Sequence, residues 1–106
     1  MADLTASQIT KHALLMLNVW GFHVWRNNNL SVPGRKFIGE KGVSDIIGYH
    51  RQTGQAVYCE VKTINDKFSE AQMLFMSRAK AAGCLCIVAH QVDWRIKLDY
   101  WTDEMK

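Results

Sequence analysis

The fold is decided by the segment Gln55–Ala89, which reads QAVYCEVK-TINDKF-SEAQMLFMSRAKAAG-CLCIVA. Its first eight residues are rich in β-formers and its last six form a short apolar run, so each is predicted to be a strand. Between them, Ser69 and Gln72 match the capping box that begins a helix, and Gly83 follows where that helix would end. The expected buried face of this helix is Ala71, Leu74, Phe75, Ala79 and Ala82. A strand, a helix and a strand in this order predict a crossover connection and a parallel strand pair at the sheet centre.

The flanking sequence adds one helix and three strands. Apolar residues recur at helical spacing over Thr5–Trp20, and Phe22–Arg26 is short and rich in β-formers. Val43–Tyr49 reads as a strand that forms a hairpin with the start of the decisive segment, and alternation over Val92–Trp101 favours a last strand. The apolar stripe of the first helix comprises Ile9, Ala13, Met16, Leu17 and Trp20. We therefore expect an α/β fold, a single small domain over 1–106 with a central mixed sheet flanked by helices.

Length and composition exclude several classes of protein. With 106 residues, 48% of them hydrophobic and 22% charged, the chain has the size of one domain and is not typical of disordered proteins. No run reaches the roughly 18–20 apolar residues of a membrane helix, and the N-terminus lacks the pattern of a signal peptide, so we expect a cytoplasmic protein. Cys59, Cys84 and Cys86 form neither a disulfide framework nor a zinc motif.

The net charge of +3 is concentrated in the segment Arg26–Lys41. Arg26, Arg35, Lys36 and Lys41 oppose only Glu40 there, so the rest of the chain is neutral. The segment, which includes Asn27, is rich in turn formers and is expected to be a long basic loop. It is either a solvated surface loop or a contact for a phosphate-rich partner such as DNA.

Two carboxylates fall in unexpected places. Asp45 and Glu60 are predicted to lie inside otherwise apolar strands, and Lys62 shares a strand face with Glu60 because side chains alternate. If the hairpin brings Asp45 near Glu60, the two carboxylates invite a divalent cation such as Mg²⁺ or Mn²⁺. A lysine beside such a metal can act on the attacking water or neutralise charge on a phosphate. The alternative is an ion pair of Glu60 and Lys62 on a solvent-facing sheet, with Asp45 closing a turn.

Three motifs in sequence resemble one nuclease family. They are Gly42-Val-Ser-Asp45-Ile-Ile-Gly48, then Tyr58-Cys-Glu60-Val-Lys62, then Ser69-x-x-Gln72. Their order and spacing resemble the PD-(D/E)XK nuclease superfamily, most closely its stand-alone VRR-NUC branch, which the Trp25-Arg26-Asn27 stretch also resembles. The resemblance extends from the first helix to the strand ending near Ala89 and implies a restriction-endonuclease-like core.

The resemblance implies a metal-dependent DNA endonuclease. Asp45, Glu60 and the carbonyl of Val61 would bind Mg²⁺ or Mn²⁺, and hydrolysis would leave a 5′-phosphate. Lys62 would position the nucleophilic water or stabilise the pentavalent phosphate. Gln72 matches a glutamine that reaches toward the active site in the family, although its capping role alone could explain its presence.

Two positions depart from the family pattern. Ser44 stands where the superfamily signature has a proline before the first aspartate, a change that removes rigidity but no ligand. The first helix of relatives often supplies an additional glutamate, whereas the polar candidates here are Gln8 and His12. A second metal site is therefore in doubt, and hydrolysis with one metal ion is preferred.

The resemblance to compact phage and bacterial proteins implies a homodimer. Such proteins are similar to Holliday-junction resolvases, and a dimer supplies two active sites with the symmetry of a four-way junction. We therefore expect structure-directed cleavage of branched DNA, in a bacterial or phage-infected cell. The four tryptophans are expected to be core or partly buried residues more often than interface residues: Trp20, Trp25, Trp94 and Trp101. Two alternatives are an inactive nuclease-like DNA-binding module and an unrelated domain with a surface ion-pair cluster.

Neutralising two charges of the basic segment tests its contact with phosphate. An Arg35→Ala/Lys36→Ala variant should bind DNA more weakly and lower the slope of log affinity against log salt concentration by roughly two, since each phosphate contact releases about one counterion. Fluorescence anisotropy at several salt concentrations measures the slope. An Arg78→Ala/Lys80→Ala variant removes the same charge from the predicted helix and serves as the control. An unchanged slope in the first variant would mean that the segment does not touch phosphate.

Overall fold

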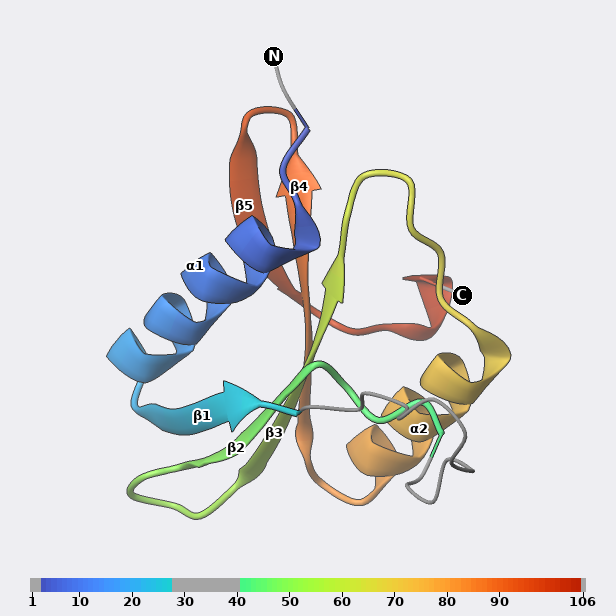
Figure 1. Cartoon of the computed structure of the whole chain (residues 1–106). Coiled ribbons are helices and arrows are strands. Elements are labelled where there is room, and N and C mark those ends of the chain that lie inside the picture. The colour runs from blue at the N-terminus through green and yellow to red at the C-terminus, as the bar shows by residue number, and fades with distance from the viewer. Residues whose placement is uncertain (1–2, 28–40, 106) are drawn as a thin grey trace, which may run out of the picture.

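The computed structural model describes residues 3–27 and 41–105 and contains a five-stranded sheet between two helices (Figure 1). The elements in chain order are α1 (Ala6–Val19), β1 (Phe22–Arg26), β2 (Ile46–His50), β3 (Ala56–Lys62), α2 (Glu70–Ala81), β4 (Leu85–Val92), β5 (Arg95–Tyr100) and a 3₁₀ turn (Asp103–Met105). None of the helices in the described part of the chain is long and apolar enough to span a membrane. The predicted α/β architecture with a central mixed sheet is confirmed.

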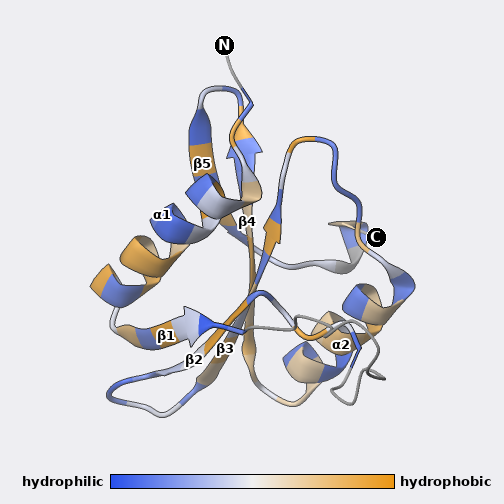
Figure 2. Cartoon of the chain, in the orientation of Figure 1, coloured by the Kyte–Doolittle hydropathy of each residue, from blue (hydrophilic) through white to orange (hydrophobic). Residues whose placement is uncertain are grey.

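The sheet has the order β1-β2-β3-β4-β5. The β3–β4 pair is parallel and the other three pairs are antiparallel. Because α2 connects β3 to β4, the predicted crossover and the parallel pair near the sheet centre are confirmed. The hydrophilic turn between β2 and β3 closes the predicted hairpin (Figure 2).

The two faces of the sheet carry separate hydrophobic clusters because side chains alternate along each strand. On the face covered by α1, Ile9 and Leu17 pack with Cys59 and other buried strand residues. On the opposite face, Met76 of α2 packs with Val88 and neighbouring residues. The two helices therefore lie on opposite sides of the sheet, as Figure 1 shows.

Both helices begin with a capping box. Thr5 and Gln8 cap α1, and the predicted pair Ser69 and Gln72 caps α2, each pair exchanging side-chain and backbone hydrogen bonds. The expected helix faces were partly wrong. Trp20 is 45% exposed and Leu74 50% exposed, and Ala82 is also exposed, while the buried face of α2 includes Met76. The face is rotated because α2 packs through Met76 and Ala79 against β4 rather than through Leu74.

Asp45 lies just before β2 and not inside a strand as predicted. Strand pairing with β3 begins at Ile46, which lies opposite Cys59. One residue earlier, the backbone amide of Val61 donates a hydrogen bond to Asp45 Oδ2 at 2.9 Å. The Asp45 carboxylate therefore accepts the hydrogen bond that a backbone carbonyl would accept if the strand pairing continued.

Gly42 stands where the chain touches the first turn of α2. Its φ is +83°, and a Cβ at this position would lie 2.2 Å from the carbonyl oxygen of Ala71. Both the left-handed backbone and the close approach require glycine. The contact holds the residues that precede Asp45 against the helix that carries Gln72.

Alanine substitutions at Gly42 and Gly54 separate the effect of the left-handed backbone from that of the close approach to α2. Gly42→Ala should destabilise the protein by at least about 3 kcal/mol, because it combines left-handed strain with a backbone clash. Gly54→Ala is the matched control, since Gly54 has a φ of +75° and no atom within 4 Å of the added Cβ. The control should lose only about 1 kcal/mol. Urea unfolding of both variants measures the difference, and equal losses would contradict the close contact.

Candidate active site

A pocket of about 760 Å³ opens at one end of the sheet. It lies where β1 and β3 end, where β2 begins, and where the first turns of α1 and α2 approach. Its lining residues are Ala6, Thr10, Arg26, Asn27, Asp45, Glu60, Val61, Lys62, Asp66 and Gln72. The fold thus brings together all of the predicted catalytic and metal-binding residues. Arg26 and Asn27 of the basic segment join them, whereas Lys41 is exposed outside this lining and Arg35 and Lys36 lie outside the described residues.

Glu60 is the most deeply buried charged group of the pocket. It lies on the sheet face that α2 covers, and only 1% of its surface is exposed. Its Oε1 accepts a hydrogen bond of 3.1 Å from Gln72 Nε2. Its Oε2 is buried without a hydrogen-bond partner among the described residues. One carboxylate oxygen is therefore held in place and the other is left for a ligand.

Asp45 is fixed by backbone contacts on both sides. Its Oδ2 accepts the amide of Val61, and its own carbonyl oxygen accepts the amide of Asn27 at 2.7 Å. The register of β2 and β3 places Asp45 one residue beyond the pair Ile46 and Cys59, beside Glu60. The two predicted carboxylates therefore meet in the pocket.

Lys62 is held by neutral acceptors. Its Nζ donates to Gln72 Oε1 at 2.8 Å and to the Lys67 carbonyl at 3.0 Å, and it lies 4.8 Å from the centre of the Phe68 ring. Only 9% of Lys62 is exposed, and the described residues form no ion pair between it and Glu60. The alternative of a solvent-facing Glu60–Lys62 ion pair is wrong, because α2 covers this face of the sheet.

Gln72 combines the two roles that the sequence left open. Its Oε1 accepts the amide of Ser69 at 2.9 Å, which completes the capping box of α2. The same oxygen accepts Lys62 Nζ, and Nε2 donates to Glu60. Capping is therefore only part of what this side chain does in the structure.

Burial dominates the electrostatics of the carboxylate pair. Burial, together with the hydrogen bond and the charge of the adjacent Asp45 carboxyl, raises the pKa of Glu60 to about 9, and the opposing effect of Lys62 is smaller. The contact between the two carboxyls becomes a hydrogen bond only when one of them is protonated. Burial, with the charges of Glu60 and Asp45, also raises the pKa of the Cys59 thiol on the opposite sheet face. The site therefore favours a bound proton or a bound cation over two free negative charges.

Two polar pocket residues, Thr10 and Asp66, were not predicted from the sequence. Thr10, 4% exposed, lines the pocket from α1, whereas Gln8 is used in the cap and His12 is exposed. No local sequence pattern marks Thr10 as a pocket residue, because the placement of α1 on the sheet brings it there. Asp66 also lines the pocket, and its Oδ2 accepts hydrogen bonds from the amide and hydroxyl of Thr63 at 2.9 and 2.7 Å. These bonds lower the pKa of Asp66 and hold it in a local turn.

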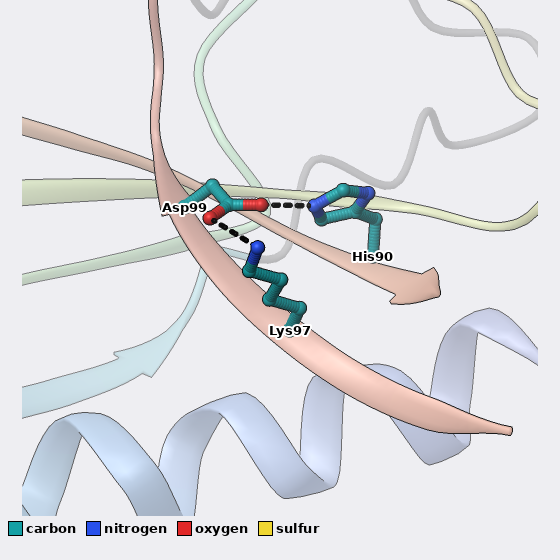
Figure 3. Close-up of polar contacts among 3 residues, drawn as sticks. All are labelled: His90, Lys97 and Asp99. Carbon is teal, nitrogen blue, oxygen red and sulfur yellow. Dashed lines mark hydrogen bonds and ion pairs between the residues drawn. The ribbon is translucent and has the colours of Figure 1, made fainter. Parts of the chain in front are cut away.

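A second hollow of about 600 Å³ shares Lys62 and Asp66 with the first. His90 lines it from β4, beside Lys62 in the parallel register. His90 Nε2 lies 2.7 Å from Asp99 Oδ2, and Lys97 Nζ lies 3.6 Å from the other oxygen of Asp99 (Figure 3). The hydrogen bond with His90 lowers the pKa of Asp99. This cluster ties β4 to β5 next to the pocket.

The donors in the pocket fit a hard divalent cation. Carboxylate oxygens are the preferred ligands of Mg²⁺ and Mn²⁺, and Glu60 Oε2 is a buried oxygen without a partner among the described residues. Within residues 3–27 and 41–105, no three His, Cys, Asp or Glu side chains converge as a metal-binding group. The expected ligand set has two carboxylates and the carbonyl of Val61, so it does not require a third such side chain.

The sequence profile of the VRR-NUC domain matches residues 36–93, more than half of the chain. The chain belongs to the VRR-NUC family. This family is a nuclease branch of the PD-(D/E)XK superfamily, so the resemblance seen in the sequence is confirmed. No curated protein matches the chain at a significant level.

Solved structures share the fold of this VRR-NUC chain. Hjc of Archaeoglobus fulgidus, a Holliday junction resolvase from an archaeal hyperthermophile, is 16% identical with a TM-score of 0.57. The match covers 90% of this chain and 74% of Hjc. A structure described as a VRR-NUC domain is 24% identical with a TM-score of 0.55, and the match covers 80% of this chain and 84% of that one.

The raised pKa of Glu60 predicts how stability changes with pH. Between pH 4.5 and about 9, the Glu60 carboxyl is protonated in the folded protein and ionised in the unfolded chain. The metal-free protein should therefore lose stability as pH rises through this window. Glu60→Gln removes the titrating group. At pH 8 the variant should melt at least about 5 °C above the wild type, the shift that about 1 kcal/mol produces in a domain of this size.

Thermal unfolding in a metal chelator at pH 5 and pH 8 measures the effect, with the exposed Glu104→Gln as control. Added Mn²⁺ should raise the melting temperature of the wild type but not that of Glu60→Gln. A Glu60→Gln variant with the same pH dependence as the wild type would contradict the buried, protonated carboxyl.

Proposed function

We propose that this chain is a Mg²⁺- or Mn²⁺-dependent endonuclease that hydrolyses DNA phosphodiester bonds and leaves 5′-phosphates. The observation that carries the proposal is the buried Glu60 carboxylate, which lies beside Asp45 with one oxygen unpartnered among the described residues and with Lys62 in the same pocket. Membership in a nuclease family supports the same conclusion. We assign this activity to one nuclease domain over residues 1–106.

Asp45, Glu60 and the carbonyl of Val61 would hold the cation. The cation would act as a Lewis acid on the phosphate and lower the pKa of an attacking water. Lys62 Nζ, oriented by Gln72 and the Lys67 carbonyl, would position that water or stabilise charge on the pentavalent phosphate. Gln72 would act by orienting both Glu60 and Lys62.

The pocket favours one cation. Among its lining residues, α1 contributes Ala6 and Thr10, neither of which carries a carboxylate. Thr10 Oγ1 donates to the Ala6 carbonyl at 2.7 Å, so its hydroxyl is already used within the helix. Asp66 is engaged by Thr63. Asp45 and Glu60 are the lining carboxylates that lie beside each other, so we assign one cation to this pair.

Branched DNA is the proposed substrate and a homodimer the proposed assembly. Arg26 and Asn27 at the pocket, together with Arg35, Lys36 and Lys41, would contact the phosphate backbone. The fold is shared with Hjc, a Holliday junction resolvase. Two copies related by a twofold axis would present two pockets to a symmetric four-way junction.

Cleavage of labelled four-way junction and linear duplex DNA in Mn²⁺ tests the proposal. The wild type should cut the junction faster than the duplex. Asp45→Asn and Lys62→Ala should each lower the rate at least about 100-fold, because each removes a ligand or a charge at the reacting phosphate. Chelation of the metal should abolish cutting, and DNA ligase should reseal the nicks because they carry 5′-phosphates.

Lys80→Ala, on the exposed side of α2, is the control and should cut as the wild type does. If the wild type binds DNA but does not cut it, the chain is an inactive DNA-binding module. Equal cutting by Asp45→Asn and the wild type would refute the assigned site.

A further inference from the structure

Three rings form an exposed cluster on β1 and β2. The ring of Trp25 lies 5.5 Å from that of His23 and 6.4 Å from that of Tyr49, and His23 and Tyr49 are 5.4 Å apart. Trp25 is 44% exposed and Tyr49 45% exposed. We call these three residues the aromatic cluster. These exposed rings contribute little to the core. Aromatic side chains that gather on a surface are typical of a binding site.

The aromatic cluster lies on the same sheet face as the carboxylates. Paired residues on neighbouring strands point to the same face, and His23 pairs with Tyr49 across β1 and β2. Trp25 pairs with Ile47, which pairs with Tyr58 of β3, and Glu60 lies two residues after Tyr58 on the same face. The opposite face holds Phe22 and Ile46 in the cluster under α1. The rings therefore lie on the face of the sheet from which the Glu60 carboxylate projects.

The chain leads directly from the aromatic cluster into the pocket. Trp25 is followed by Arg26 and Asn27, which line the pocket with Asp45. Arg26 supplies positive charge at the pocket, whereas Arg51 donates hydrogen bonds to Asn18 of α1 and to the carbonyl of Phe22 and is not part of this surface. The aromatic cluster is thus continuous along the chain with a basic side chain of the pocket, and rings beside positive charge bind single-stranded nucleic acid.

We propose that the aromatic cluster is a stacking platform for unpaired nucleobases next to the phosphate that is cut. The inference rests on the proposed nuclease function and specifies its substrate. Bases in a continuous duplex have both faces covered by their neighbours, so only unpaired nucleotides offer a free face to Trp25 or Tyr49. Stacking does not depend on the identity of the base. The aromatic cluster would therefore bind DNA with single-stranded nucleotides at the site and would not prefer a sequence.

Binding of short oligonucleotides in a metal chelator tests stacking without cleavage. A labelled 12-nucleotide single strand should bind Trp25→Ala and Tyr49→Ala about tenfold more weakly than the wild type, since each loses a stacking partner. Trp25→Phe should retain most of the affinity, whereas Trp25→Leu should not. Trp94→Ala is the matched control because Trp94, 73% exposed between β4 and β5, lies away from the aromatic cluster.

A second oligonucleotide separates stacking from phosphate contact. An abasic strand keeps its phosphates but has no bases, so the wild type should bind it about tenfold more weakly than the intact strand. Trp25→Ala should lose little further affinity for it. Equal affinity of the wild type for both strands, or equal losses in Trp25→Ala and Trp94→Ala, would overturn the proposal.

Sedimentation and junction cleavage separate base stacking from subunit contact and from the nuclease function itself. If Trp25→Ala changes the sedimentation of the DNA-free protein but not its oligonucleotide affinity, the aromatic cluster is a contact between copies of the chain and the proposal fails. Cleavage of four-way junction DNA in Mn²⁺ is measured in parallel for the wild type. If the wild type cuts the junction but Trp25→Ala and Tyr49→Ala bind the single strand as well as the wild type does, the stacking proposal is refuted and the nuclease function is not. If the wild type does not cut the junction, the nuclease function is refuted.

Discussion

The register of β2 against β3 is the constraint on which the site depends. Ile46 and Cys59 lie opposite each other in the core under α1, so the next residues, Asp45 and Glu60, must point to the other face. A slip by one residue would move Ile46 out of the core and the Asp45 carboxylate away from Glu60. Hydrophobic packing on one face thus specifies the position of the carboxylates on the other.

Gln72 connects this pair of strands to α2. One amide closes the capping box, holds Lys62 and bonds Glu60, so the start of the helix and the orientation of two pocket residues depend on the same side chain. The contact of Gly42 with Ala71 places the segment before Asp45 against the same helical turn. The position of α2 and the geometry of the site are therefore set together.

Much of the fold could be predicted because its signals are local. The capping box at Ser69, the period-two alternation around Glu60 and the stop at Gly83 each fix one element without knowledge of the rest. The exposure of Leu74 could not be predicted, because it depends on how α2 rotates when Met76 packs against β4.

The same limit applies to the site. Spacing indicated Asp45, Glu60 and Lys62, since strand pairing converts sequence spacing into proximity. Thr10 and Asp66 escaped notice because they reach the pocket through the placement of α1 and of the turn after β3, which is a property of tertiary structure.

The carboxyl group of Glu60 and the ammonium group of Lys62 do not pair with each other. A buried carboxylate beside another acid costs folding free energy, and the natural compensation would be an ion pair with Lys62. The fold instead gives Lys62 two neutral acceptors, Gln72 Oε1 and the Lys67 carbonyl, and gives Glu60 a single neutral donor. Glu60 therefore holds a proton that a cation can displace, and the ammonium group of Lys62 stays available to an anion. A cation can bind the carboxylates, and a phosphate can bind the ammonium group of Lys62. The ligand that fits this pocket therefore combines a cation with a phosphate.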